Sequence, residues 1–167
     1  SSHSLPESSA ADAAREFIRL IEIMAALRAP DGCPWDREQT HASLKPMTLE
    51  EAYEVLAAID EGTDEDLAGE LGDLLLQVVF HAQIAAEEGR FTMADVIAHV
   101  MAKMVRRHPH VFGDVEARTA GQVLANWDRI KAEEKQKKGV GGSLLDEVPE
   151  RMNALARAAN RPGQRLV

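Results

Sequence analysis

The sequence predicts an all-α protein, a bundle of four or five helices joined mostly by short connections. Three observations lead to this prediction. Apolar residues recur at intervals of three and four in several segments, threonines stand just before some of these segments, and glycine or proline follows them. No stretch of useful length alternates apolar and polar residues as a half-buried strand would. Aromatic residues make up only 4% of the chain, whereas alanine, leucine, glutamate and arginine are plentiful.

The first helix is expected over residues 10–28, where Phe17 and Leu20 belong to one apolar face. Residues 1–9 are polar, and we expect them to be a disordered start or an expression remnant. Residues 29–47 contain three prolines and a glycine, which end helices. We therefore expect a long ordered loop there, with at most one short helical turn.

The remaining helices are predicted from their caps. Thr48 followed by Glu51 is a capping-box pattern, which predicts that the second helix begins at Thr48 and runs to about residue 60. The third, fourth and fifth helices are expected over residues 64–88, 93–108 and 120–138, after caps at Thr63, Thr92 and Thr119. Residues 139–167 are expected to form a flexible linker and a short C-terminal helix. The helical domain is therefore predicted over residues 10–138.

Length and charge exclude several classes of protein. The 167 residues suffice for one domain with a substantial core. With 28 acidic and 19 basic residues the net charge is −9, which argues against a general affinity for nucleic acid. No apolar run approaches the roughly 18 residues that span a bilayer, and no signal-peptide pattern is present, so we expect a cytoplasmic protein. The single cysteine, Cys33, excludes an internal disulfide and a thiolate zinc cluster.

Four acids on two neighbouring predicted helices form the candidate site. The stretch over residues 71–82 is apolar almost all round and yet contains Asp73, with Glu70 one turn before it. Burying an unpaired carboxylate costs several kcal/mol, so Asp73 must be protonated, paired with a cation or bound to a metal. Glu51 and Glu54 have the same spacing on the preceding helix. If the two faces meet, four carboxylates converge.

Such a cage of hard oxygen ligands suits Mg²⁺, with Mn²⁺ as a substitute, better than zinc or copper. Magnesium usually keeps waters and contacts substrate phosphates, which predicts a di- or triphosphate ligand. A di-iron bundle is the competing interpretation, but it needs two Glu-x-x-His pairs, and the only candidate pair is Glu38 with His41 in the predicted loop. The structural alternative is that these acids are helix-capping or solvated first-turn residues.

Cations and aromatic rings elsewhere could bind the rest of a nucleotide. Lys103 and Arg107 are four residues apart on one helix face and could contact phosphates. Trp127 and Lys131 have the same spacing on the last long helix, and Trp35 is a second ring on which a base could stack. The structural alternatives are that Arg107 complements a helix dipole and that Trp127 is a core residue.

In this order, the motifs resemble those of the MazG-type nucleoside triphosphate pyrophosphohydrolases, of the all-α NTP pyrophosphatase superfamily. The resemblance extends over about residues 17–151 and includes the segments DGCPWDREQTHASLKPMTLEEAYE, DLAGELGDLLLQ and KMVRRHPHVFGD. It implies a Mg²⁺-dependent hydrolase that splits nucleoside triphosphates into a nucleoside monophosphate and pyrophosphate. It also implies a helical homodimer that clears non-standard or surplus nucleotides. The sequence does not identify the preferred base or sugar, because a tryptophan ring stacks on every base.

The resemblance also implies a role for individual residues. The family's metal ligands fall on Glu51, Glu54, Glu70 and Asp73. Glu50, the first acid of the EExxE motif, is implied to take a proton from the attacking water, and Lys103 and Arg107 to neutralise the leaving group. Many family members carry two such domains, and this chain resembles the amino-terminal copy. An alternative is therefore a nucleotide- or protein-binding regulatory module with little turnover.

Overall fold

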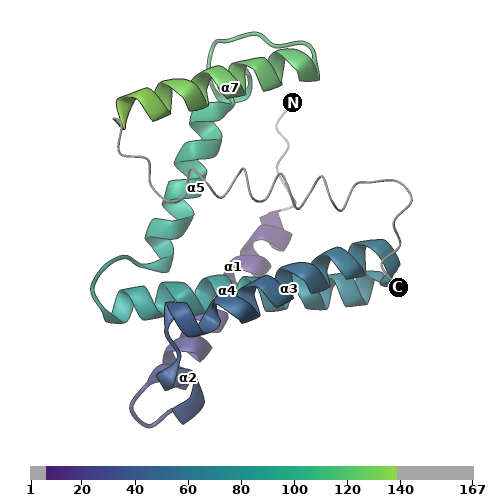
Figure 1. Cartoon of the computed structure of the whole chain (residues 1–167). Helices are drawn as coiled ribbons and strands as arrows, with labels where there is room; N and C mark the ends of the chain where they lie inside the picture. The colour runs from purple at the N-terminus through teal and green to yellow at the C-terminus, as the bar shows by residue number, and fades with distance from the viewer. Residues whose placement is uncertain (1–6, 139–167) are drawn as a thin grey trace. The chain divides into compact units, whose positions relative to one another are not determined.

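A computed structural model describes residues 7–138 of the chain (Figure 1). These residues form seven α-helices and no strand, which confirms the all-α prediction. The helices are α1 (Glu7–Arg28), α2 (Pro34–Glu38), α3 (His41–Glu61), α4 (Asp64–Glu87), α5 (Met93–Arg107), α6 (Pro109–Phe112) and α7 (Ala120–Lys137). Two of them, α2 and α6, are no longer than five residues, so five longer helices build the described part.

The described residues fall into two compact units that divide inside α5, between Met101 and Ala102. The prediction of a helical domain over residues 10–138 stays a prediction. The linker and short helix expected over residues 139–167 lie outside the described residues, as do residues 1–6 of the expected leading segment. The first helix begins at Glu7, a few residues earlier than expected.

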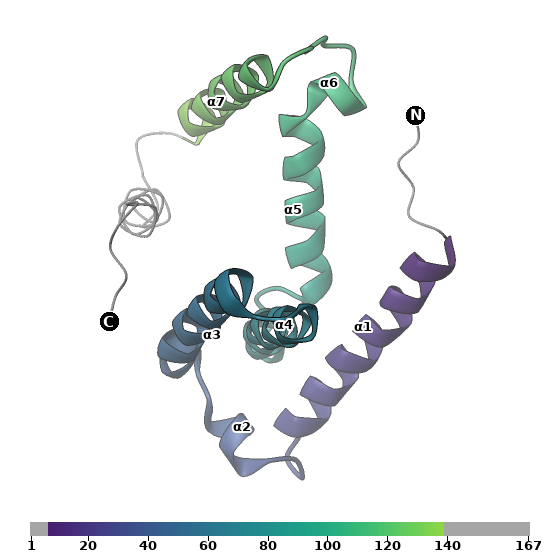
Figure 2. The same ribbon diagram turned by 90° about the vertical axis from the view of Figure 1, so that its right-hand side faces the viewer.

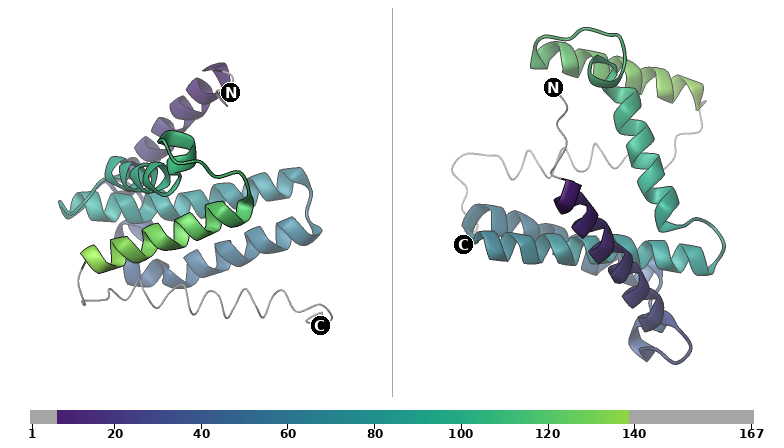
Figure 3. Two further views of the ribbon diagram at one scale, coloured as in Figure 1. Left: turned by 90° about the horizontal axis from the view of Figure 1, so that it is seen from above. Right: turned by 180° about the vertical axis from the view of Figure 1, so that it is seen from behind.

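The first unit is built on the hairpin of α3 and α4, which lie side by side in the views of Figures 1 to 3. Helix α1 packs against the other side of α4 and also against α2. The centre of the unit is a cluster of buried apolar side chains contributed by all three long helices. These side chains are Met24, Leu44, Val79, Phe80 and Ile84. Each contributes roughly 1.5 to 3 kcal/mol of burial free energy, enough to fix α1 on the hairpin.

Helix α3 begins at His41, and the predicted start at Thr48 is wrong. Thr40 is the cap: its hydroxyl accepts a hydrogen bond from the Ser43 N–H (3.1 Å), and its own N–H donates to the Ser43 hydroxyl (2.9 Å). Pro46 lies inside the helix, where it removes one backbone hydrogen bond. The helix tolerates this loss because Leu44, one turn from its start, is completely buried in the core.

The other helix ends agree with their predicted caps. Thr63 forms a capping box with Asp66, and Gly89 ends α4 with a positive φ of 68° that favours glycine. Thr92 accepts a hydrogen bond from the N–H of the residue three positions later, at the start of α5. Thr119 caps α7 in the same way, since its hydroxyl accepts a hydrogen bond from the Gln122 N–H. The Gln122 side chain accepts from the Arg118 N–H, whereas a capping box would require the N–H of Thr119.

The second unit contains the last part of α5, with α6 and α7. Arg106 and Arg107 of α5 both form ion pairs with Glu134 of α7, at 2.5 and 2.9 Å. The ring of His108 meets the ring of Trp127 edge-on, with 5.2 Å between the centroids. These contacts join α5 to α7. None of the helices in the described part combines the length and hydropathy that a membrane span requires.

Candidate metal centre

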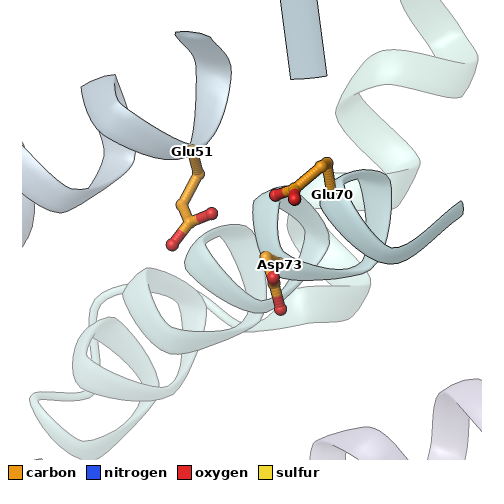
Figure 4. Close-up of side chains that lie close together, drawn as sticks. All are labelled: Glu51, Glu70 and Asp73. Carbon is orange, nitrogen blue, oxygen red and sulfur yellow. The ribbon is translucent and has the colours of Figure 1, made fainter. Parts of the chain in front are cut away.

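Three of the predicted acids meet where α3 packs against α4. Glu51 extends from α3, and Glu70 and Asp73 are one turn apart on α4 (Figure 4). One carboxylate oxygen from each residue lies within 4.8 Å of the other two. Three negative groups from two helices can therefore contact a single small ion.

The local fold explains this meeting. Glu51 lies in the middle of α3, because that helix begins ten residues before it, so Glu51 is not a capping residue. Glu70 lies beyond the first turn of α4. In that first turn, Asp66 forms the capping box with Thr63. The hydrogen bonds of the helix ends are thus made by other side chains. The capping interpretation therefore explains neither glutamate.

Within residues 7–138, no cationic side chain forms an ion pair with Glu51, Glu70 or Asp73. The pKa values of Glu51 and Glu70 are both raised, first by burial and then by neighbouring carboxylates, with Asp73 acting on both residues. Glu51 Oε2 and Glu70 Oε2 are buried, and neither accepts a hydrogen bond from any residue that the structure describes. A buried carboxylate oxygen without a partner favours a proton or a cation beside it. Hard oxygen donors with unused lone pairs fit a small divalent cation such as Mg²⁺ or Mn²⁺.

Glu54 and Glu50 are placed differently from these three acids. Glu54 is exposed one turn after Glu51, and its charge raises the pKa values of both Glu51 and Glu70. It lies close enough to form a hydrogen bond with either one when a proton is present. Glu50 is exposed and lies with Glu54 and Tyr53 along an open groove on α3. Both residues therefore border the cluster from its solvent side.

Asp73 is more exposed than the sequence predicted. The apolar stretch around it suggested a carboxylate removed from water, but Asp73 is exposed. Leu71 and Leu75 on the same helix are also 49% and 40% exposed. Helices α3 and α1 cover only part of α4, and Asp73 lies at the edge of the covered part. The groups taken out of water are instead the inner oxygens of Glu51 and Glu70.

The predicted nucleotide contacts belong to other helices than the acid cluster. Lys103, Arg107, Trp127 and Lys131 all belong to the second unit. There the Arg107 guanidinium is paired with Glu134, and these hydrogen bonds lower the pKa of that carboxyl to about 2. Trp35 is half-exposed on α2, and no hydrogen bond within the described residues links it to the acids. Their roles toward a nucleotide stay predictions.

A polar network between α3 and α4 was missed by the sequence reasoning. It joins His41 and Thr48 of α3 to Gln77 and His81 of α4. The signal that could have revealed it is the spacing from Asp73, since Gln77 and His81 follow at successive intervals of four. Because the helix was predicted to start at Thr48, His41 was assigned to a loop, and its position on the face of α3 was not recognised.

Comparison with known proteins agrees with this arrangement. Residues 39–112 match the family described as the MazG nucleotide pyrophosphohydrolase domain, and this range contains all the acids of the cluster. The nucleoside triphosphate pyrophosphohydrolase of Escherichia coli (strain K12) is 55% identical over 141 residues, which cover 84% of this chain and 53% of that protein. The nucleoside triphosphate pyrophosphohydrolase/pyrophosphatase MazG of Thermotoga maritima is 52% identical over 142 residues, which cover 85% and 53%.

A solved structure shows the same helical arrangement. The mazG-related protein from Thermotoga maritima has a TM-score of 0.57 and 25% sequence identity, covering 68% of this chain and 97% of that one. The present chain spans about half the length of the two curated relatives. The match to the MazG domain over residues 39–112 includes the α3–α4 hairpin and every acid that meets there. Residues 39–112 of the chain therefore match the MazG domain, and most of the chain is similar to these nucleoside triphosphate pyrophosphohydrolases.

Proposed function

We propose that this chain hydrolyses nucleoside triphosphates between the α and β phosphates, producing a nucleoside monophosphate and pyrophosphate. The observation that carries the proposal is the meeting of Glu51, Glu70 and Asp73, two of which have a buried oxygen without a partner. The activities named for the curated relatives support the choice of substrate. The biological role proposed is the removal of non-standard or surplus nucleotides, in the cytoplasm.

The acids of α3 and α4 would hold the metal. Glu51, Glu70 and Asp73 offer the converging oxygens, and Glu54 borders them closely enough to be the fourth ligand. We propose Mg²⁺ as the ion, with Mn²⁺ as a substitute, because the donors are all carboxylate oxygens. When bound, the ion neutralises phosphate oxygens and lowers the pKa of a coordinated water.

Glu50 is proposed to accept the proton of the attacking water. It is exposed beside Glu51, and no other protein side chain in the described residues donates a hydrogen bond to it. A solvent-accessible carboxylate next to the metal ligands can take a proton and return it to bulk water. Glu54 is proposed as a second catalytic residue, since it lies close enough to Glu51 and Glu70 to contact the same ion.

The remaining substrate contacts are proposed from the sequence. Lys103 and Arg107 would neutralise the pyrophosphate that leaves, Lys131 would contact a phosphate, and Trp127 or Trp35 would stack on the base. The Arg107 guanidinium is ion-paired with Glu134. For Arg107 to bind the leaving group, its guanidinium must contact the phosphate and Glu134 together.

A homodimer is also proposed. Large apolar side chains of α3 are about half exposed, among them Leu49, Tyr53 and Leu56. Leu49 and Tyr53 border an open groove along the same helix. A second copy covering this face would remove it from water.

Product analysis tests the proposed activity. The full chain is incubated with a panel of nucleoside triphosphates, with Mg²⁺ or with EDTA, and pyrophosphate and orthophosphate are measured separately. We expect pyrophosphate only, and only with the metal. Glu54→Gln and Asp73→Asn should each lower the rate at least about 100-fold, because a lost carboxylate near a shared ion is not replaced. Glu65→Gln, an exposed acid on the first turn of α4, is the matched control and should keep the rate.

Two results would contradict the proposal. Release of orthophosphate would show that a different bond is cleaved. Tight binding of the metal–nucleotide complex without product over hours would favour the regulatory module.

A further inference from the structure

A polar network lies beside the acid cluster, and the proposed reaction does not use it. The rings of His41 and His81 are stacked, with 5.1 Å between centroids and planes 10° apart. Their Nδ1 atoms are 2.8 Å apart. On the far side of His81, its Nε2 is 3.3 Å from the Thr48 hydroxyl, which lies 3.1 Å from Gln77 Oε1. Gln77 is the one polar side chain of the described residues that is fully buried.

The chemistry of the groups fixes the direction of every hydrogen bond. Arg90 contacts His41 Nε2, and a guanidinium can only donate, so this nitrogen is an acceptor. His41 Nδ1 therefore carries the hydrogen and donates to His81 Nδ1. His81 Nε2 must then carry its own hydrogen and donate to Thr48. The Thr48 hydroxyl in turn donates its hydrogen to Gln77 Oε1. The backbone carbonyl of Leu44, one turn earlier in α3, shares this hydrogen.

This network and the acids occupy consecutive turns of the same helix–helix seam. Thr48 lies three residues before Glu51 on α3, and Gln77 lies four residues after Asp73 on α4. Both intervals place the paired residues on one helix face. Among the described residues, the side-chain hydrogen bonds between α3 and α4 all belong to this network. Apart from Gln77, the buried residues of the two helices are apolar, and apolar packing permits sliding more readily than directional hydrogen bonds.

We propose that Thr48, Gln77 and His81 are positioning residues for the divalent cation. Their chain of hydrogen bonds fixes how α3 lies along α4, and so sets the separation of Glu51 from Glu70 and Asp73. This role rests on the proposed function, since it requires the acids to bind the ion.

Repulsion within the metal-free cluster is what the network opposes. The carboxylates raise one another's pKa values, so they push α3 and α4 apart when no ion lies between them. A fixed register one turn away keeps the donors close and reduces the reorganisation that binding requires. Burial lowers the pKa of His81, which keeps its ring in the neutral form that the network needs.

The test is Mn²⁺ binding to the full chain without nucleotide. The electron paramagnetic resonance signal of free Mn²⁺ measures how much of the ion is bound. Thr48→Val keeps the shape of the side chain but removes the hydroxyl, and we expect binding about tenfold weaker, as for other residues that orient metal ligands. Thr48→Ser restores the hydroxyl and should bind within about twofold of the wild type. Mn²⁺ affinity unchanged in Thr48→Val would overturn the proposal.

Two further variants separate positioning from general stability. Met24→Ala opens the core at α1 without touching the seam, and it should lower the unfolding temperature while leaving Mn²⁺ affinity unchanged. An equal loss of affinity in Met24→Ala would overturn the positioning role. If Thr48→Val does not fold, His81→Leu removes the same link, and wild-type affinity in that variant counts against the role. Absence of Mn²⁺ binding to the wild type would instead contradict the metal centre itself, and this role with it.

Discussion

Glu51 and Glu70 are held in a position that is unfavourable without a cation. Each has one buried carboxylate oxygen that accepts no hydrogen bond from the described part of the chain, and the pKa of each is raised by burial. A side chain selected only for stability would be neutral or paired there. Local conflicts of this kind are expected at functional sites, where the ligand supplies the missing compensation.

Replacing Glu51 by glutamine should therefore stabilise the metal-free protein. Because the pKa of Glu51 is higher in the folded state than in the unfolded chain, the folded state binds more protons, and stability falls as pH rises through that range. At neutral pH, in EDTA, we expect Glu51→Gln to raise the unfolding temperature by about 2 °C. Circular dichroism melting curves measure the change. A lower unfolding temperature in EDTA would contradict this account of the site.

The same variant should lose its response to metal. Added Mn²⁺ should raise the unfolding temperature of the wild type, because the ion binds only the folded state, and leave that of Glu51→Gln nearly constant. Glu22→Gln, which removes an exposed acid from α1, is the control and should respond to Mn²⁺ as the wild type does.

At the scale of elements, α3 shows where reasoning from local sequence failed. The helix includes Pro46, which a pattern rule treats as a stop, and its cap pairs Thr40 with Ser43 rather than with a glutamate. Burial of Leu44 against α1 and α4 outweighs the hydrogen bond that Pro46 removes. That contact is between distant parts of the chain, so no local pattern could reveal it.

Thr40 should consequently matter to stability. Thr40→Ala removes the cap of α3 and should lower the free energy of unfolding by about 1 kcal/mol, whereas Thr40→Ser should retain most of it. Urea denaturation of the full chain measures both. No effect in Thr40→Ala would mean that the helix does not depend on this cap.

Helices α5 and α7 are joined by an ion-pair cluster whose contribution depends on pH. The pKa of Glu134 is lowered to about 2, mainly by hydrogen bonds from Arg107 and Arg106. A carboxyl with a lowered folded pKa stabilises the protein above its ordinary value of 4.5, and this stability is lost as pH falls from there to about 2. Glu134→Gln should cost of order 1 kcal/mol at pH 7 after solvent screening.

Urea unfolding of the wild type and Glu134→Gln across this pH range checks the prediction. The two curves should converge toward pH 2, because the wild-type carboxyl is then protonated. A difference that stays constant with pH would exclude the ion pairs as its cause.

For the whole molecule, sequence reasoning predicted the fold class and the ends of α4, α5 and α7 because threonine caps and glycine are local signals. It also predicted that acids of two helices would meet, because their spacing defines helix faces. It missed the network of His41 and His81, whose partners are 40 residues apart in the chain. It also misjudged the exposure of Asp73, because hydropathy around a residue does not show which neighbours cover it.

The central claim is that carboxylates of α3 and α4 together bind one divalent cation. Anomalous diffraction from crystals of the full chain grown with Mn²⁺ would test it most directly. The account predicts a strong manganese peak in contact with Glu51, Glu70 and Asp73, absent from crystals of Asp73→Asn grown in the same way. Manganese bound only elsewhere, with these three side chains free of it, would contradict the claim.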